Sequence, residues 1–174
     1  MRKDVIKSLF AIKQSEIPFD VIERDTKLPI DRKKIITIPG VRHCGKSTLM
    51  EIAINTLVEK GVPKEYILWL GFDDERLRSM TSEELDDVIA SYMEMYPNIP
   101  IKDVYMFFDE SFRVWTEKGL TKISGFGCHK SFVFKGYELI GMDLERFLQL
   151  NLFHLDYIDE DYYSVAPGIN FRHY

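Results

Sequence analysis

The sequence predicts an α/β fold of three layers, in which helices cover both faces of a mostly parallel sheet. Three short apolar runs, at 34–38, 66–70 and 104–108, have the length and composition of buried strands. Amphipathic segments separate these runs, and strands that alternate with helices form parallel sheets. The chain has 174 residues, 45% of them hydrophobic, which is enough to bury one core.

Each element follows from a local pattern. Apolar residues at helical spacing predict a short helix over 3–14, and prolines interrupt the lead-in that follows. The strand at 34–38 ends at Pro39-Gly40, and a helical stripe then runs from Leu49 to Val58. Thr81 and Glu84 form a capping-box pattern ahead of a helix that extends to Tyr96. Beyond position 110 the alternation stops, and we expect a short strand at 131–135 and a helix at 143–154.

Composition narrows the functional classes. The net charge of -5 does not favour DNA as a partner, although it says nothing about a local basic patch. The two cysteines are too few and too far apart in sequence for a disulfide framework, which indicates a reducing compartment. No window approaches the roughly 20 apolar residues of a membrane span. We therefore expect a cytoplasmic protein without membrane association.

The strongest chemical signal is a phosphate-binding loop. Residues Gly40 to Ser47 match the pattern G-x-x-x-x-G-K-[ST], whose glycines let backbone N–H groups wrap phosphates at the N-terminus of a helix. In this pattern Lys46 reaches the β- and γ-phosphates, and the Ser47 hydroxyl ligates Mg²⁺. The expected nucleotide-binding residues are Gly40, Val41, Arg42, His43, Cys44, Gly45, Lys46, Ser47 and Thr48.

An acidic pair completes the expected site. Asp109 and Glu110 follow the third apolar run, which carries them to the edge of the sheet where the phosphate loop also lies. In a Walker B arrangement, Asp109 holds the Mg²⁺ shell and Glu110 polarises the attacking water, so Glu110 and Lys46 are the expected catalytic residues. ATP and Mg²⁺ are the expected cofactors.

The run from Ile35 to Glu110 resembles the archaeal and bacterial AAA-type ATP-binding proteins. The resemblance rests on IITIPGVRHCGKSTLM, PKEYILWLGFDDERL, the TSEELDDVIASYMEMYP segment and VYMFFDE, and it covers roughly residues 1 to 110. It implies a P-loop NTPase core of the RecA or AAA type. Lys46 and Ser47 then serve phosphate and magnesium, Asp109 serves magnesium, and Glu110 is the catalytic acid.

After Glu110 the chain departs from this family's pattern. It continues Ser-Phe-Arg-Val-Trp and lacks the family's sensor strand ending in Gly-Ser, its arginine finger and its C-terminal region. The core is therefore expected to be incomplete, through truncation or a frame disruption, or through divergence that keeps only the nucleotide core. We expect an N-terminal helix and lead-in at 1–29, an ATP-binding domain at 30–135 and a divergent tail at 136–174.

The leading function is ATP binding with Mg²⁺-dependent hydrolysis. One alternative is a small-molecule or nucleotide kinase, which shares the phosphate loop. Another is a non-hydrolysing, degenerate nucleotide-binding protein. A GTPase is disfavoured because the chain contains no Asn-Lys-x-Asp tetrapeptide. The expected partners are the nucleotide and either a protein or a second copy of the chain.

Overall fold

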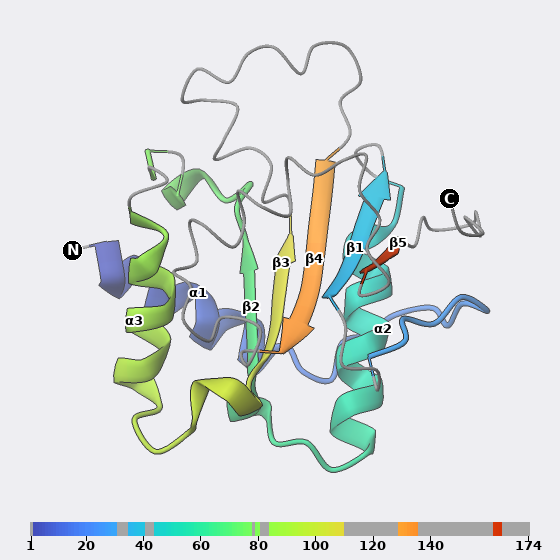
Figure 1. Cartoon of the computed structure of the whole chain (residues 1–174), viewed down its shortest axis with the longest axis horizontal. Coiled ribbons are helices and arrows are strands. Elements are labelled where there is room, and N and C mark those ends of the chain that lie inside the picture. The colour runs from blue at the N-terminus through green and yellow to red at the C-terminus, as the bar shows by residue number, and fades with distance from the viewer. Residues whose placement is uncertain are drawn as a thin grey trace.

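The computed structural model describes residues 2–30, 35–40, 44–77, 79–80, 84–109, 129–135 and 162–164. Its α-helices in these ranges are α1 (Arg2–Ser15), α2 (Lys46–Glu59) and α3 (Asp86–Met95). Its strands there are β1 (Ile35–Gly40), β2 (Ile67–Gly71), β3 (Tyr105–Asp109), β4 (His129–Lys135) and β5 (Tyr162–Ser164), as Figure 1 shows. The structure confirms, to within a few residues, the helix expected at 3–14 and the helical stripe from Leu49 to Val58. It likewise confirms the three strands expected at 34–38, 66–70 and 104–108 and the strand expected at 131–135.

The strands form one sheet in the order β2-β3-β4-β1-β5. β2 pairs parallel with β3 and β1 pairs parallel with β5, whereas β4 runs antiparallel to both of its neighbours, β3 and β1. Four of the five described strands therefore point the same way, and the sheet is mostly parallel in direction with a reversed strand at its centre. Parallel strands such as β2 and β3 need a crossover connection, which is usually a helix. An antiparallel strand such as β4 does not.

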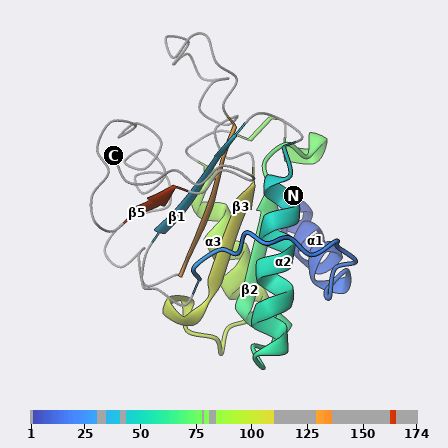
Figure 2. The same cartoon turned by 90° about the vertical axis from the view of Figure 1, so that its right-hand side faces the viewer.

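The two faces of the sheet pack against different helices. Leu68, Leu70, Met106 and Phe108 contact α1 and α3 on one face, whereas Trp69, Phe107, Ile38 and Val133 contact α2 on the other. Figure 2 shows α2 running along the sheet. Successive side chains of a strand point to opposite faces, so these continuous apolar runs bury both faces at once. The three expected layers are present in the described residues.

Helix α1 is tied to the edge of the sheet at β2. The Gln14 side-chain amide donates to the carbonyl oxygens of Lys64, at 3.2 Å, and Ile67, at 3.1 Å, and its oxygen accepts from the Tyr96 hydroxyl at 2.5 Å. Lys3 and Lys7 of α1 pair with Glu94 of α3 at 2.8 and 2.6 Å. Gln14 therefore holds the C-terminal end of α1 beside β2, and the two lysines hold its N-terminal half against α3.

Helix α3 starts later than the sequence pattern predicted. Its first residue is Asp86 and Leu85 stands at the N-cap, without a side-chain capping hydrogen bond. The predicted cap residue Thr81 lies outside the described residues, as does the expected helix at 143–154. Met93 of α3 is 49% exposed. Strand β5 was not predicted, because three residues are too few for a recognisable pattern.

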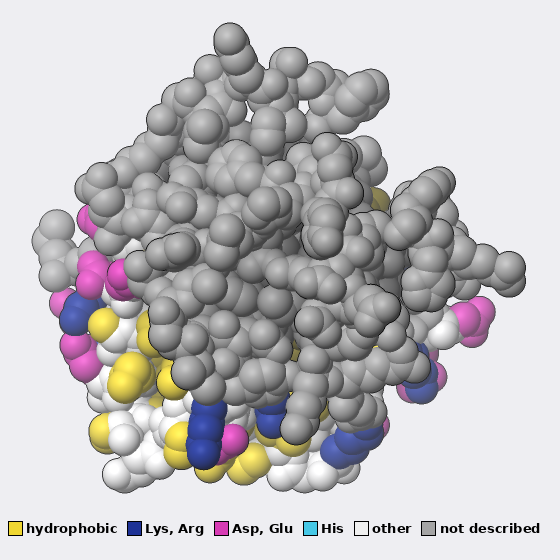
Figure 3. All heavy atoms as spheres, viewed as in Figure 1, with side chains coloured by type: hydrophobic (Ala, Val, Ile, Leu, Met, Phe, Trp, Pro, Cys, Tyr) yellow, Lys and Arg dark blue, Asp and Glu magenta, His cyan; other side chains and the backbone are white. Residues whose placement is uncertain are grey.

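Charges on the described surface are mixed. In the space-filling view, acidic and basic side chains lie interspersed along the described rim of this face (Figure 3). Within the described residues, none of the helices has the length and apolarity that a membrane crossing requires.

Candidate functional site

The site begins where β1 leads into α2. β1 ends at Gly40, and α2 begins at Lys46 with Gly45 at its N-cap. Gly45 has a φ of +92°, in the left-handed region that favours glycine, and its carbonyl accepts the first helical hydrogen bond from Leu49 N at 3.1 Å. The loop therefore ends at the N-terminus of α2, which is the positive end of the helix dipole. Val41, Arg42 and His43 lie outside the described residues.

Lys46 is a buried cation at this helix N-terminus. It is 3% exposed, and its ammonium group lies 3.9 Å from the sulfur of Cys44. Cys44 and Thr48 are half-buried, and the Cys44 thiol is free. Lys46 is the first residue of the helix that follows the glycine loop, which is the place from which the lysine of a phosphate loop reaches phosphate oxygens.

The structure brings Ser47 and Asp109 together. Asp109 ends β3 and is 6% exposed, and the Ser47 hydroxyl donates a hydrogen bond to its Oδ2. The Ser131 hydroxyl, from β4, donates to the other oxygen, Oδ1, at 2.5 Å. A hydroxyl and a carboxylate side by side are the oxygen donors that Mg²⁺ prefers. The side chains of Ser47 and Asp109 thus fit the metal expected beside a phosphate loop. Glu110 lies outside the described residues.

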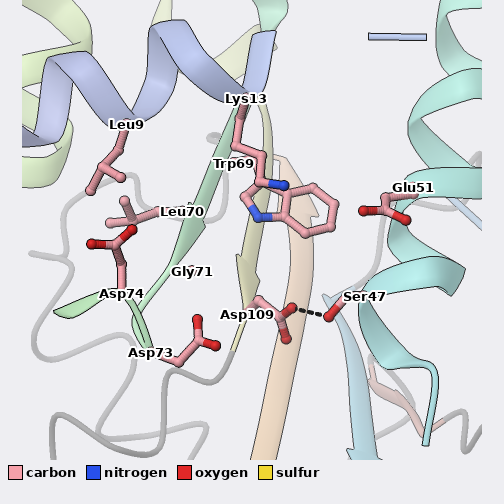
Figure 4. Close-up of a pocket in the computed structure, with 10 residues that line it drawn as sticks. All are labelled: Leu9, Lys13, Ser47, Glu51, Trp69, Leu70, Gly71, Asp73, Asp74 and Asp109. Carbon is pink, nitrogen blue, oxygen red and sulfur yellow. Dashed lines mark hydrogen bonds between the residues drawn. The ribbon is translucent and has the colours of Figure 1, made fainter. Parts of the chain in front are cut away.

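A cavity of about 290 Å³ opens beside this pair. Figure 4 shows that its wall combines α1, the end of β2, α2 and Asp109. Asp73 and Asp74 also line the cavity. The Asp74 carboxylate accepts hydrogen bonds from the Arg76 guanidinium and from the Arg76 backbone N–H at 2.9 Å, and these bonds lower its pKa.

Two charged side chains face each other across this cavity. Lys13, from α1, lies 5.3 Å from the centroid of the Trp69 ring and pairs with Glu16 at 2.9 Å. Glu51, from α2, points into the cavity one turn after Ser47 (Figure 4). Burial raises the pKa of Glu51, Lys13 opposes the shift, and the nearby carboxylates Glu16 and Asp109 add to it. The cavity therefore contains a carboxyl group, that of Glu51, whose ionised form is disfavoured by its surroundings.

Several residues at the site carried no signal in the sequence. Ser131, Glu51 and Lys13 belong to no motif. Arg24 lies in the lead-in, yet its guanidinium sits against Gly45, so close that an added Cβ would lie 2.6 Å from its Nη2. Ser131, Lys13 and Arg24 reach the site only because segments distant in sequence approach one another, whereas Glu51 lies one turn after Ser47 on α2.

Comparison with known proteins agrees with this geometry. The family model described as an AAA domain matches residues 32–122, just over half of the 174-residue chain. Neither a search of curated proteins nor a search of solved structures returned a match. The matched region begins three residues before β1 and ends beyond β3, so it contains the phosphate loop, Ser47 and Asp109. The chain therefore belongs to the AAA domain family.

Proposed function

We propose that this protein binds ATP together with Mg²⁺ and hydrolyses it. The observation that carries the proposal is the meeting of the Ser47 hydroxyl with the Asp109 carboxylate at the N-terminus of α2, directly after a positive-φ glycine. The two side chains come from positions 62 residues apart, so folding, and not local chain geometry, brings them together. Membership of the AAA domain family supports a nucleotide as the ligand.

Each residue has a separate task in this proposal. The N–H groups at the start of α2 and the buried Lys46 bind the β- and γ-phosphates. Ser47 and Asp109 would hold Mg²⁺, which when bound neutralises charge on the phosphate oxygens. Glu110 follows β3 directly, and we assign to it the orientation of the attacking water and acceptance of its proton. We also propose that the protein binds either a protein partner or a second copy of its own chain.

The cavity favours one second candidate, a kinase that passes the phosphoryl group to a bound acceptor. Its volume of about 290 Å³ lies beside Ser47 and Asp109 and includes the apolar surface of Trp69. An acceptor hydroxyl there would replace water as the nucleophile.

Calorimetry with Mg-ATP on the full chain tests the binding step. Lys46→Ala should weaken the affinity about 10- to 100-fold, the range expected for a lost hydrogen bond between charged groups. Lys60→Ala is the matched control, because Lys60 is an exposed lysine at the other end of the same helix. No binding by the folded wild-type chain, or equal affinity in the wild type and Lys46→Ala, would refute the nucleotide site.

Phosphate release tests the hydrolysis step. Glu110→Gln should keep Mg-ATP binding and lose most of the release, because the amide cannot accept a proton. Release that Glu110→Gln leaves unchanged would remove the role given to Glu110. Phosphoryl transfer to an added acceptor, with little release to water, would instead favour the kinase.

A further inference from the structure

The central strand β4 contributes a buried hydroxyl to the site. We propose that Ser131 is a positioning residue, which fixes the Asp109 carboxylate so that its second oxygen faces Ser47 and the expected Mg²⁺. This inference rests on the proposed Mg-ATP site and assigns a role to a segment that no motif in the sequence marks.

Strand register places the two side chains together. β3 and β4 pair antiparallel, and the paired register ends with Phe108 opposite Phe132. One residue further along, the same register brings Asp109 opposite Ser131, and their side chains are hydrogen-bonded. On its other side Ser131 faces Ile38 of β1. Directly opposed residues have Cβ atoms about 5 Å apart, within reach of a short serine side chain. A strand hydrogen-bonded on both sides holds this hydroxyl at a fixed place.

The hydrogen bond divides the two carboxylate oxygens between two tasks. Ser131 donates to Oδ1 at 2.5 Å, and Ser47 contacts Oδ2. The χ2 torsion of aspartate is intrinsically broad, so a donor on one oxygen is what sets the plane of the carboxylate. With Oδ1 held by Ser131, Oδ2 is the oxygen that accepts from Ser47 and whose second lone pair would ligate Mg²⁺.

Burial alone does not explain this contact. Ser91 of α3 is also 0% exposed, yet its hydroxyl has no hydrogen-bond partner within the described residues. Ser131, equally buried, is aimed at a carboxylate that is itself 6% exposed. Groups that orient a metal-binding carboxylate typically change metal affinity 10- to 100-fold when they are removed.

The test is calorimetric titration of ATP into the full chain at a series of free Mg²⁺ concentrations, and also in EDTA. Ser131→Ala should raise the Mg²⁺ concentration needed for half-maximal tightening by about tenfold, while the affinity for metal-free ATP stays within about twofold. Ser91→Ala, which removes a buried hydroxyl away from the site, should match the wild type. Ser131→Thr, which keeps a hydroxyl on a strand-compatible side chain, should restore most of the Mg²⁺ response.

A second pair of variants keeps the inference testable if Ser131→Ala does not fold. Ser131→Thr and Ser131→Val have similar shapes and differ in the hydroxyl, so the inference requires a different Mg²⁺ response from these two proteins. An unchanged Mg²⁺ requirement in Ser131→Ala, equal responses of the Thr and Val variants, or equal weakening of ATP binding in EDTA would each overturn it. A wild-type affinity for ATP that does not change with the Mg²⁺ concentration would overturn the proposed function itself, and the inference with it.

Discussion

Replacement of Gly45 by alanine separates backbone strain from nucleotide binding at the phosphate loop. Gly45 has a φ of +92°, where an L-residue costs about 1–2 kcal/mol. The added Cβ would also lie 2.6 and 2.7 Å from Nη2 and Nη1 of Arg24. These atoms end a flexible, exposed side chain, so the guanidinium moves away at little further cost. We expect Gly45→Ala to lower the free energy of unfolding by about 1–2 kcal/mol without nucleotide.

Gly61→Ala is the matched control for this variant. Gly61 has the same φ of +92° at the end of α2, but a Cβ there would meet nothing within 4 Å. Urea unfolding without ligand should therefore show a similar loss for both variants. Mg-ATP at about 100 times its dissociation constant should stabilise the wild type and Gly61→Ala by roughly 2.7 kcal/mol.

Gly45→Ala should lose most of this ligand-dependent gain. The methyl group projects at the loop whose N–H groups wrap the phosphates, and it displaces the Arg24 cation from that place. Retention of the full gain by Gly45→Ala would refute the placement of the phosphates at this loop. Loss of the gain in Gly61→Ala as well would show that strain in α2, and not the site, controls binding.

The remaining predictions concern three charged side chains. Arg24→Ala should weaken Mg-ATP binding about tenfold in calorimetry, because a charge-assisted contact at the phosphate loop is lost; unchanged affinity would show that Arg24 only covers the empty loop. Glu51→Gln should tighten Mg-ATP binding and raise the free energy of unfolding at neutral pH. The raised pKa of Glu51 means that its ionised carboxylate lowers stability at any pH above the ordinary pKa of glutamate. Below the ordinary pKa, the variant and the wild type should unfold alike. Lys3 and Lys7 lower the pKa of Glu94 to about 2, so their pairing supports stability at neutral pH and is lost as the pH falls from the ordinary pKa toward 2. Urea unfolding across that pH range should show a shallower fall for Glu94→Gln than for the wild type, and high salt should shrink the difference because the pair is exposed.

Much of the fold could be predicted because it follows from local patterns. β-branched and aromatic runs marked β1, β2 and β3, and helical spacing marked α1 and α2. The predicted start of α3 was wrong. The capping-box pattern of Thr81 and Glu84 indicated a start just after Thr81, whereas α3 begins at Asp86. The register of an apolar face constrains the middle of a helix more strongly than its first turn.

The sequence by itself determined the phosphate loop and the acidic strand end, because both are contiguous patterns whose chemistry depends on residue type and spacing. Tertiary structure alone decided the rest of the site. The reversal of β4 places Ser131 opposite Asp109, the docking of α1 brings Lys13 to Trp69, and the lead-in carries Arg24 to Gly45. Each of these contacts joins segments far apart in the chain, and no periodicity encodes which segments will meet. Their positions follow from strand order and from the packing of buried faces, which exist only once the chain has folded.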